Sequence, residues 1–329
     1  MPHLGACNAS DCRGVRAIQI REFGGPEVME LVEMPDPEPA DGEVVVEVAR
    51  CGVNFADTHA TRNDYLAEQS LPLIPGGEIA GRTSDGRRVA AIIATGGYAS
   101  KVAVPESWLI PVGGGVSDDQ AASLLLQGLT AHALVHRCAR LEEGETVVVQ
   151  AAGGGTGTLA VQLAKRAGVR VIALASTPDK RALAERLGAD ASVDSRAEDL
   201  KAAILEANEG REVEAVFEMS GGVAFEACLR TLAPFGRLVT FGIASREPNE
   251  LKTQRLMRTS RSVVGFWIVH LLRRPDLLRQ GIEELLGAVA SGELEVVIGD
   301  VFPMSDVAQA QIELAERRTQ GKLLLDPSA

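Results

Sequence analysis

Cysteine is sparse in this sequence, and no two cysteines stand in the CxxC spacing of zinc knuckles. The five cysteines are scattered along 329 residues, at Cys7, Cys12, Cys51, Cys138 and Cys228. Small secreted domains need a dense disulfide framework, which this distribution does not offer. We therefore expect a protein of the reducing cytoplasm.

Long apolar runs and targeting signals are also missing. The stretch from Gln120 to His136 has no formal charge, but it is too polar for the roughly 20 residues of a bilayer core. The opening MPHLGACNASDCRG has neither the apolar core of a signal peptide nor the Arg-rich pattern of a transit peptide. We interpret residues 1–14 as a loose extension without an assigned role and expect no membrane partner.

Positive charge is in deficit, with 33 basic against 45 acidic residues and a formal net charge of -12. This balance favours solubility and argues against nucleic acid or an anionic membrane as the main partner. The length exceeds that of most single domains, and 46% of the residues are hydrophobic. Two domains are therefore expected.

The hydrophobic pattern changes once along the chain. Residues 15–112 contain the strand-like segments VRAIQI, EVVVEVA, RRVAAII and KVAVP, separated by Gly, Pro, Asp and Asn. Residues 118–140 follow a helical pattern, and strands then alternate with helices, which implies a parallel sheet covered on both faces. Its strands are expected at residues 146–150, 169–175, 191–194, 214–218, 237–241 and 262–269.

The helices between these strands are expected in LAVQLAKRAG, DKRALAERLGA, AEDLKAAILEAN and GGVAFEACLRTLAPFG. After a further helix in DLLRQGIEELLGAVASG, the chain returns to a strand in VVIGDVFP, a helix in VAQAQIELAERR and a last strand in KLLLD. We expect this last part to rejoin the N-terminal domain, so that the parallel-sheet domain is an insertion.

A glycine-rich segment connects the first parallel strand to its helix. The strand VVVQ runs directly into AAGGGTGTLAVQLAK, where Gly155, Gly157 and Ala160 satisfy the GxGxxA fingerprint. A glycine run can simply form a tight turn, but the strand before it and the helix after it favour a Rossmann dinucleotide site. There the pyrophosphate lies on the N-terminus of the helix. The residues predicted to bind it are Gly154, Gly155, Thr156 and Gly157.

The end of the second parallel strand predicts which dinucleotide binds. NAD enzymes usually carry an acid there, whereas this chain continues with Ser176 and Lys180. Both side chains suit a 2'-phosphate, and one charge-assisted contact contributes about 1.5 to 3 kcal/mol. The alternative is that Lys180 is a solvated helix residue whose charge is partly offset by Asp179. The pattern favours NADPH.

With these residues in place, the chain resembles the medium-chain dehydrogenases/reductases, in particular the zinc-independent quinone oxidoreductase (zeta-crystallin-like) branch, from about residue 15 to residue 325. The segments that carry the resemblance are CGVNFADTHATRNDY, PLIPGGEIAG, LLLQGLTAHALV, AAGGGTGTLAVQLAK, STPDKRALAERLGAD, GRLVTFG and TQGKLLL. It implies an α/β protein with a GroES-like β-rich catalytic domain (residues 15–137 and 276–329), a doubly wound Rossmann NADP-binding domain (residues 138–275), a cleft between them and a homodimer built on Rossmann edge strands.

The resemblance also implies that no metal is bound. Zinc-dependent relatives place their ligands at positions that carry Asn54, Gly77 and Gln127 here, and none of these is a good zinc ligand. The segment between Ala91 and Val104 has no counterpart of the four-cysteine zinc lobe. Without the metal as Lewis acid, alcohol oxidation is disfavoured.

The catalytic residues implied by the resemblance are Asn54, Asp57 and Tyr65, together with His59 at a position where many relatives have a second tyrosine. Asn54 would bind a carbonyl oxygen or the nicotinamide ribose, Tyr65 would donate to a developing oxyanion, and His59 would add a proton donor. Three alternatives stay open: Asp57 braces a helix, His59 only packs, and Tyr65 is a lid aromatic.

Further cofactor contacts are implied downstream. Thr130 and the strand-end residues Phe241, Gly242 and Ile243 would lie near the nicotinamide. Ser195 replaces a tyrosine that often holds the 2'-phosphate, and Arg317 matches an arginine that reaches this phosphate, or else is a solvated helix charge. The resemblance places Phe266 and Trp267 at the cleft and near the dimer edge, where core or interface packing is favoured over substrate contact.

The predicted function is reduction of a small-molecule acceptor, a quinone or an α,β-unsaturated carbonyl compound, by hydride from NADPH. One alternative is an enoyl-thioester reductase acting on coenzyme A or carrier-bound chains. An alternative of another class is a weakly catalytic NADPH-binding structural or sensing protein. A fold alone does not decide among them.

Overall fold

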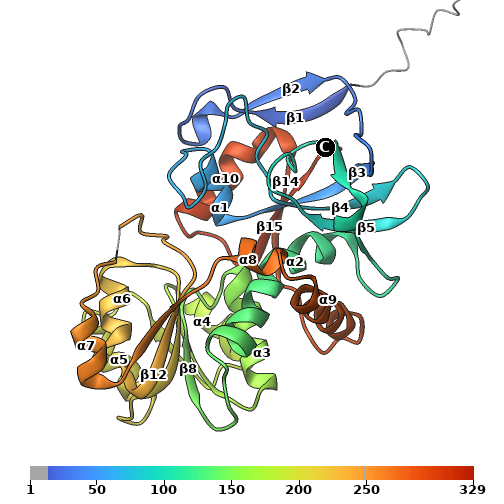
Figure 1. Ribbon diagram of the computed structural model, residues 1–329. Coiled ribbons are helices and arrows are strands. Elements are labelled where there is room, and N and C mark those ends of the chain that lie inside the picture. The colour runs from blue at the N-terminus through green and yellow to red at the C-terminus, as the bar shows by residue number, and fades with distance from the viewer. Residues whose placement is uncertain (1–13, 248) are drawn as a thin grey trace, which may run out of the picture. The chain divides into compact units, whose positions relative to one another are not determined.

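The computed structural model describes residues 14–247 and 249–329, which form two compact units (Figure 1). The β-rich unit contains residues 14–111, 301–316 and 324–329, and the parallel-sheet unit contains residues 112–300 and 317–323. All but the last residue of the expected extension at residues 1–14 lies outside the described residues, as do Cys7 and Cys12. Within the described part of the chain, no helix is both long and apolar enough to span a membrane.

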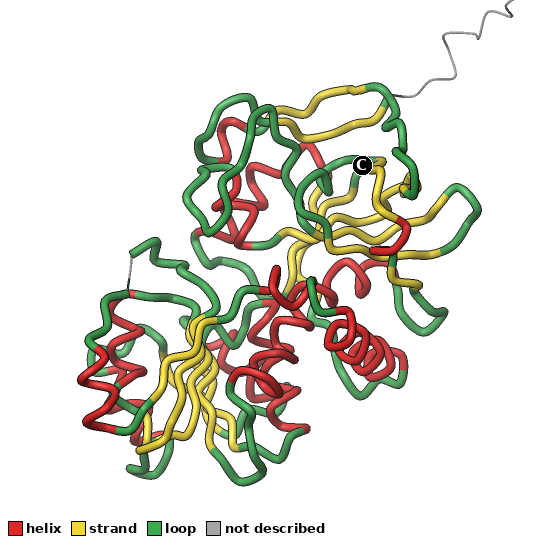
Figure 2. Tube along the Cα trace, viewed as in Figure 1, coloured by secondary structure: helices red, strands yellow, loops and turns green. Residues whose placement is uncertain are grey.

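The parallel-sheet unit is built on six parallel strands in the order β10-β9-β8-β11-β12-β13. The strand order reverses between β8 and β11, as in the doubly wound dinucleotide-binding fold. Figure 2 shows helices on both sides of these strands. The strands are β8 (Thr146–Val149), β9 (Arg170–Ala175), β10 (Ala191–Asp194), β11 (Val213–Glu218), β12 (Leu232–Thr240) and β13 (Ser262–Gly265).

The helices of this unit connect successive strands or pack beside the sheet. Their bounds are α2 (Asp118–Ala133), α3 (Gly155–Arg166), α4 (Pro178–Arg186), α5 (Leu200–Ala207), α6 (Gly222–Leu229), α7 (Thr253–Thr259), α8 (Ile268–Leu272) and α9 (Pro275–Ala290). One turn of π-helix, η3 (Leu134–Cys138), continues α2. Strands β8 and β9 are almost wholly buried, which agrees with their unbroken apolar sequences.

One strand and one helix end earlier in the structure than the sequence predicts. The strand expected to reach residue 269 ends at Gly265, and α8 follows, because a short apolar run does not distinguish a strand from a buried helix. The helix expected in GGVAFEACLRTLAPFG ends at Leu229, and Leu232 already pairs with Val213 of β11. Pro234 lacks the N–H that a helix interior needs, so the apolar residues around it extend β12 instead.

The division into compact units also differs from the expected domain limits. Residues 112–137 and 276–300, expected with the β-rich domain, belong to the parallel-sheet unit because α2 packs against both α3 and α9. Residues 301–316 and 324–329 do belong to the β-rich unit. The limit between the units therefore falls within β14 (Ile298–Pro303) and β15 (Lys322–Asp326).

The β-rich unit has a two-stranded antiparallel sheet, β1-β2, and contributes most of a second sheet with the order β14-β15-β3-β4-β5-β7, in which β6 also pairs with β3. The remaining elements are β1 (Val15–Gln19), β2 (Glu30–Met34), β3 (Glu43–Val53), β4 (Glu78–Thr83), β5 (Arg88–Ile92), β6 (Lys101–Pro105), β7 (Ile110–Pro111), α1 (Phe55–Ala60), α10 (Val307–Ala315) and the short turns η1 (Pro26–Val28), η2 (Glu106–Trp108) and η4 (Met304–Asp306). Its core includes the fully buried Ile18, Ile79 and Tyr98.

Candidate functional site

The glycine-rich turn between β8 and α3 is closed by contacts that leave no room for side chains. A Cβ atom at Gly157 would overlap the backbone carbonyl of Ala151, and one at Gly155 would overlap the side-chain amide of Gln127. Ala151 itself has a left-handed backbone with φ +50°. Glycine at these two positions therefore lets the helix pack closely on the strand end, as the fingerprint requires.

The N-terminus of α3 faces this turn. Gly154 precedes the helix in an extended conformation, and its carbonyl accepts from Thr158 N–H at 2.8 Å. The first backbone N–H groups of a helix have no partner within it, and together with the helix dipole they favour a bound anion. The turn at residues 154–157, predicted to bind the pyrophosphate, thus has the backbone arrangement that favours an anion.

The segment that contains Arg317 lies beside the same turn. Gly321 N–H donates to the Gly153 carbonyl at 2.9 Å, and Gly321 forms a parallel bridge with Gly154. On α4, the Lys180 ammonium donates to the Arg317 backbone carbonyl at 2.5 Å. The prediction from sequence that Lys180 and Arg317 serve one part of the site is consistent with this contact.

Lys180, Arg196 and Arg317 form a cationic group. Burial, followed by the charges of Arg196 and Arg317, lowers the pKa of Lys180. An anion bound among these three side chains would offset their mutual repulsion, as the 2'-phosphate of NADPH can. Arg196 was not among the residues predicted from the sequence, although its position directly after Ser195, beyond the end of β10, could have indicated it.

Ser176 and Ser195 lie at the same edge of the sheet. Ser195 N–H donates to the Ala175 carbonyl at 3.1 Å, which holds the ends of β9 and β10 together. Ser176 follows β9 directly and is partly buried. Both hydroxyl groups therefore belong to residues that directly follow a strand, and Arg196 of the cationic group is the next residue after Ser195.

Two buried polar side chains that were not predicted from the sequence, Gln150 and Glu218, lie where the strand order reverses. Gln150 follows β8, and its Oε1 accepts from the backbone N–H groups of Met219 and Ser220, each at 3.2 Å. Glu218 ends β11 and accepts from Gly221 N–H at 2.5 Å and from Thr240 Oγ1 at 3.1 Å. Burial raises the pKa of Glu218. Polar residues at the carboxyl ends of buried strands were the available signal.

The predicted nicotinamide-side residues fall on neighbouring strand ends. Phe241 N–H donates to the Glu218 carbonyl at 3.0 Å, and Gly242 and Ile243 follow it. Phe266 N–H donates to the Thr240 carbonyl at 2.9 Å, just after β13. The carboxyl ends of the parallel strands, where the glycine-rich turn also lies, thus carry the predicted residues Phe241, Gly242, Ile243 and Phe266.

Trp267 and Thr130 are engaged within their own elements. The Trp267 ring meets the His270 ring edge to face, with the centroids 5.5 Å apart. Thr130 is buried on α2, and its Oγ1 donates to the Leu126 carbonyl at 2.8 Å. These contacts favour packing for Trp267 and leave the Thr130 hydroxyl turned to its own helix.

In the β-rich unit, Asn54 and Asp57 stand at the start of α1. The buried Asp57 carboxylate accepts from Asn54 N–H at 2.8 Å and from the Tyr98 hydroxyl at 2.7 Å. The Asn54 side-chain amide donates to Glu78 Oε2 at 3.3 Å. This arrangement favours the interpretation of Asp57 as a brace of the helix start.

His59, Asp64 and Tyr65 form a second group in this unit. His59 Nδ1 lies 2.6 Å from Asp64 Oδ1, and the His59 ring, which is 2% exposed, stacks on Tyr65 with the centroids 4.8 Å apart. Burial raises the pKa of Tyr65, so its hydroxyl stays protonated at neutral pH. A phenol and an imidazole held against a carboxylate can donate protons to a reacting oxygen.

The three positions at which the resemblance would place the ligands of a catalytic zinc do not carry zinc ligands. Asn54 is an amide bonded to Glu78, Gly77 has no side chain, and the Gln127 amide lies against Gly155. Zinc sites use thiolate, imidazole and carboxylate ligands, which these three positions do not supply.

Comparisons with known proteins agree with this architecture. Residues 40–114 match the alcohol dehydrogenase GroES-like domain, and residues 155–287 match the zinc-binding dehydrogenase domain. The predicted combination of a GroES-like domain and a Rossmann-type parallel sheet is confirmed. A quinone oxidoreductase of Pseudomonas aeruginosa is 33% identical over 328 residues, which cover 95% of this chain and 99% of the relative.

Two solved structures are similar along almost their whole length. Escherichia coli quinone oxidoreductase complexed with NADPH has a TM-score of 0.90 at 30% identity, covering 95% of this chain and 100% of that one. The quinone oxidoreductase of Thermus thermophilus, solved also in complex with NADPH, has a TM-score of 0.85 at 38% identity, covering 94% of this chain and 99% of that one.

Proposed function

Because the chain belongs to the quinone oxidoreductase family of the medium-chain dehydrogenases/reductases, we propose that it is an NADPH-dependent reductase of quinones or α,β-unsaturated carbonyl compounds that works without zinc. The observation that carries the proposal is the cationic group of Lys180, Arg196 and Arg317 beside the glycine-rich turn. NADH has no 2'-phosphate with which to neutralise such a group.

In this proposal the parallel-sheet unit binds and orients the cofactor. The N-terminus of α3 takes the pyrophosphate, and the cationic group takes the 2'-phosphate. Phe241, Gly242 and Ile243 at the end of β12 would lie along the nicotinamide half. When bound, NADPH supplies the hydride.

The acceptor is proposed to be conjugated because the chain lacks zinc ligands at the expected positions. In a quinone or an enone, the negative charge that develops after hydride arrival spreads onto a carbonyl oxygen without a Lewis acid. Tyr65 and His59 are the proposed donors to that oxygen, since the Tyr65 hydroxyl stays protonated and His59 is held by Asp64. Asn54 is assigned a positioning role through its contact with Glu78.

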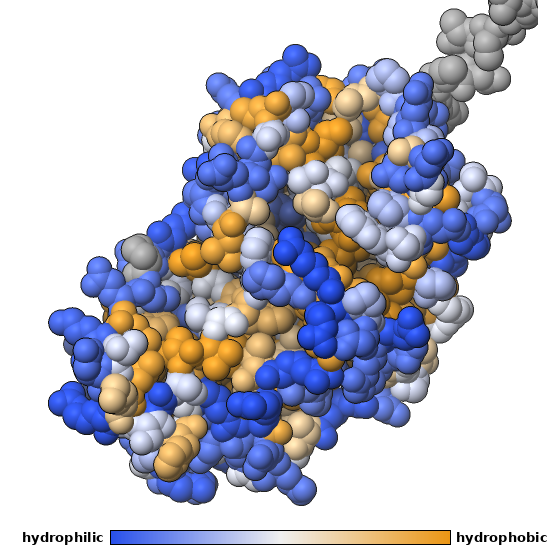
Figure 3. All heavy atoms as spheres, viewed as in Figure 1, coloured by the Kyte–Doolittle hydropathy of each residue, from blue (hydrophilic) through white to orange (hydrophobic). Residues whose placement is uncertain are grey.

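We further propose a cytoplasmic homodimer that pairs through the β13 edge of the parallel sheet. Two large apolar side chains near this edge are exposed, Phe235 at 82% and Met257 at 78%, and Phe235 N–H donates to the Ser260 carbonyl just before β13. Apolar side chains also reach the surface of the parallel-sheet unit in Figure 3. Light scattering of the protein and of Phe235→Asp tests this, because a monomeric native protein contradicts the dimer.

The test of the activity is oxidation of NADPH, with EDTA present, across a panel of quinones, free enones and enoyl-CoA esters, with NADH as the control. EDTA-resistant turnover of quinones or enones supports the proposal. Turnover confined to thioesters indicates an enoyl-thioester reductase instead. Tight NADPH binding without turnover of any acceptor indicates a binding protein.

The proton-donor assignment is tested separately with Tyr65→Phe, which keeps the ring that stacks on His59. Loss of a general acid typically costs about 100-fold or more in rate, whereas loss of a lid aromatic would leave a Phe variant active. A fall in kcat with unchanged KM for NADPH supports Tyr65 as donor. Unchanged kcat in Tyr65→Phe removes it from the mechanism and leaves His59→Asn as the next variant.

A further inference from the structure

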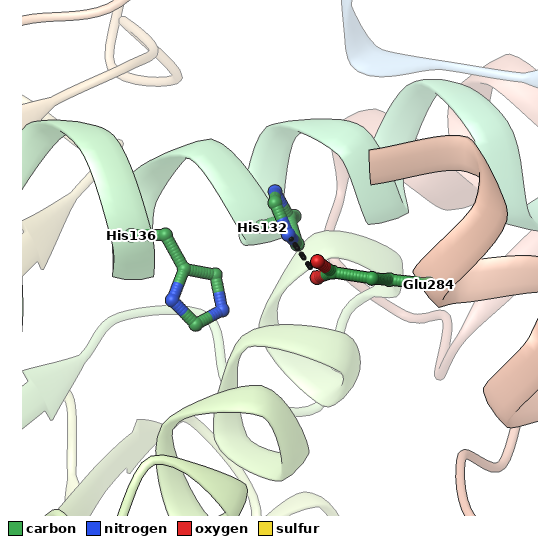
Figure 4. Close-up of side chains that lie close together, drawn as sticks. All are labelled: His132, His136 and Glu284. Atoms are coloured by element: carbon green, nitrogen blue, oxygen red, sulfur yellow. Dashed lines mark hydrogen bonds and ion pairs between the residues drawn. The ribbon is translucent and has the colours of Figure 1, made fainter. Parts of the chain in front are cut away.

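Three side chains with metal-binding chemistry meet in the parallel-sheet unit, apart from the residues assigned above to the cofactor. His132 lies near the end of α2, His136 lies in the π-helical turn that continues it, and Glu284 comes from α9. In Figure 4 a dashed line joins the His132 imidazole to the Glu284 carboxylate, and the His136 ring lies beside this pair. One ligand atom from each lies within 4.8 Å of the others, and His132 Nε2 is 2.7 Å from Glu284 Oε2.

The local structure holds His132 against α9. A Cβ atom at Gly281, one turn before Glu284, would lie 2.9 Å from Leu129 Cδ2 and 3.5 Å from His132 Nδ1. Glycine therefore leaves space for the imidazole between the helices, with Nε2 directed at Glu284. His132 is only 6% exposed, so its ring has little freedom to turn away.

His136 lies within the π-helical turn, and His132 lies just before it. Ala139 N–H donates to the Leu134 carbonyl, five residues earlier, at 2.9 Å. The ring centroids of the two histidines lie 4.5 Å apart. Single π turns inside α-helices occur frequently at functional sites.

Two imidazoles and one carboxylate offer a cation the lone pairs that coordination requires. The Glu284 carboxylate is also held in place by a side chain of its own helix. Gln280 Nε2 donates to Glu284 Oε1 at 2.9 Å and orients the carboxylate.

A cavity of about 580 Å³ opens beside the three residues and is lined by all of them. Glu283 and Glu293 also line it, and Glu293 pairs with Arg166 at 2.8 Å. The cavity gives a hydrated cation access to the ligands and leaves room for water to complete its coordination.

We propose that His132, His136 and Glu284 form a binding site for a divalent first-row metal ion, and that Zn²⁺ suits the ligand set best. Two imidazoles and one carboxylate are ordinary zinc ligands, and tetrahedral coordination at about 2.0 to 2.2 Å separates ligand atoms by about 3.3 to 3.6 Å. The ligand atoms must move slightly to reach these separations. The Glu284 side chain is 49% exposed and His136 is exposed, so both can make this movement. Water fills the remaining position.

Binding exchanges one interaction for another. The metal takes the place of the proton between His132 Nε2 and Glu284 Oε2, and that proton moves to Nδ1 or, from a protonated ring, to solvent. The ion would then join α2 to α9. This site shares no residue with Asn54, Gly77 and Gln127, the positions at which zinc-dependent relatives bind their metal.

The proposal is tested by calorimetric titration of Zn²⁺ into the metal-free full-length protein, which gives the stoichiometry and affinity of zinc binding. The background carries His3→Ala, Cys7→Ser and Cys12→Ser, because imidazole and thiol groups at these three positions could compete for zinc. We expect one Zn²⁺ per chain, with at least about tenfold weaker binding in His136→Gln and in Glu284→Gln. His270→Gln, another exposed histidine on a helix, is the matched control and should bind as the background does.

Two results overturn the proposal: no zinc binding by the background protein, or equal affinity in the background, His136→Gln and Glu284→Gln. Circular dichroism of each variant shows whether it has folded. Visible absorption of the Co²⁺-loaded protein gives an independent readout, since its bands should weaken in His136→Gln and persist in His270→Gln.

Discussion

The two units use their polar side chains in different ways. In the parallel-sheet unit, Lys180, Arg196 and Arg317 bring like charges together beside the N-terminus of a helix, and the pKa of Lys180 falls as a result of burial and of that repulsion. In the β-rich unit, Asp57 accepts hydrogen bonds from Asn54 and from Tyr98. The first arrangement gains from an anionic ligand, whereas the second is balanced within the protein.

We therefore expect the cationic group to contribute to ligand binding and the hydrogen bonds of Asp57 to contribute to stability. Substitutions in the cationic group should change cofactor affinity and leave the free energy of unfolding almost unchanged. Substitutions around Asp57 should lower the free energy of unfolding and leave cofactor affinity almost unchanged. At the glycine-rich turn the proposed binding surface is itself closely packed, so a substitution there should change both cofactor affinity and stability.

Gly157→Val should have the largest effect. Its side chain would overlap the Ala151 carbonyl, and overpacking of this kind costs about 1 to 3 kcal/mol of stability. Because the turn must also shift, NADPH affinity should fall by more than about 100-fold. Urea denaturation and cofactor fluorescence measure the two effects. Gly287→Ala, at a helical glycine where an added Cβ would meet no atom within 4 Å outside its own helix, is the control: it should keep NADPH affinity and raise stability by about 0.5 to 1 kcal/mol.

Tyr98→Phe should destabilise the protein without weakening NADPH binding. It removes the hydroxyl that donates to the buried Asp57 carboxylate, and a hydrogen bond to a charged group contributes about 1.5 to 3 kcal/mol. The urea midpoint should fall with an unchanged slope. A variant as stable as the native protein would show that Asp57 does not depend on this brace.

The sequence predicted the parallel sheet well because its apolar strands and intervening helices repeat regularly. It also located the glycine-rich turn, whose motif is local, and Lys180, which is only a few residues beyond a strand. It could not show that Asp57 meets Tyr98, because 41 residues separate the two and only the folded sheet brings them together.

Contacts between distant segments explain the other omissions. Glu284 lies 152 residues after His132, so nothing in the local pattern connects the two. The limits of β12 and β13 were missed for a different reason, since short apolar runs are compatible with either strand or helix until their pairing is known. The sequence thus predicts local motifs better than groups assembled from several elements.

Lys180→Ala should weaken NADPH binding by about 10- to 100-fold while NADH binding changes little, because only NADPH carries the 2'-phosphate. Arg196→Ala and Arg317→Ala should act in the same direction. Calorimetric titration with both cofactors measures the ratio, and thermal unfolding without cofactor checks stability. An equal loss of NADPH and NADH affinity would show that the lysine acts on the fold and not on the phosphate.

The pH dependence of NADPH binding should show a smaller effect of the same group. The pKa of Lys180 is lowered in the free protein, so its ammonium loses its proton at a lower pH than an ordinary lysine near 10.4. NADPH affinity should therefore fall as pH rises through that pKa, by about twofold where half of the side chains are neutral. A bound phosphate would raise the pKa, so binding at alkaline pH takes up a proton, which appears as a buffer-dependent heat. NADH lacks the phosphate and should show neither effect, and Lys180→Met should abolish both for NADPH. A pH-independent affinity for NADPH would place the phosphate away from Lys180.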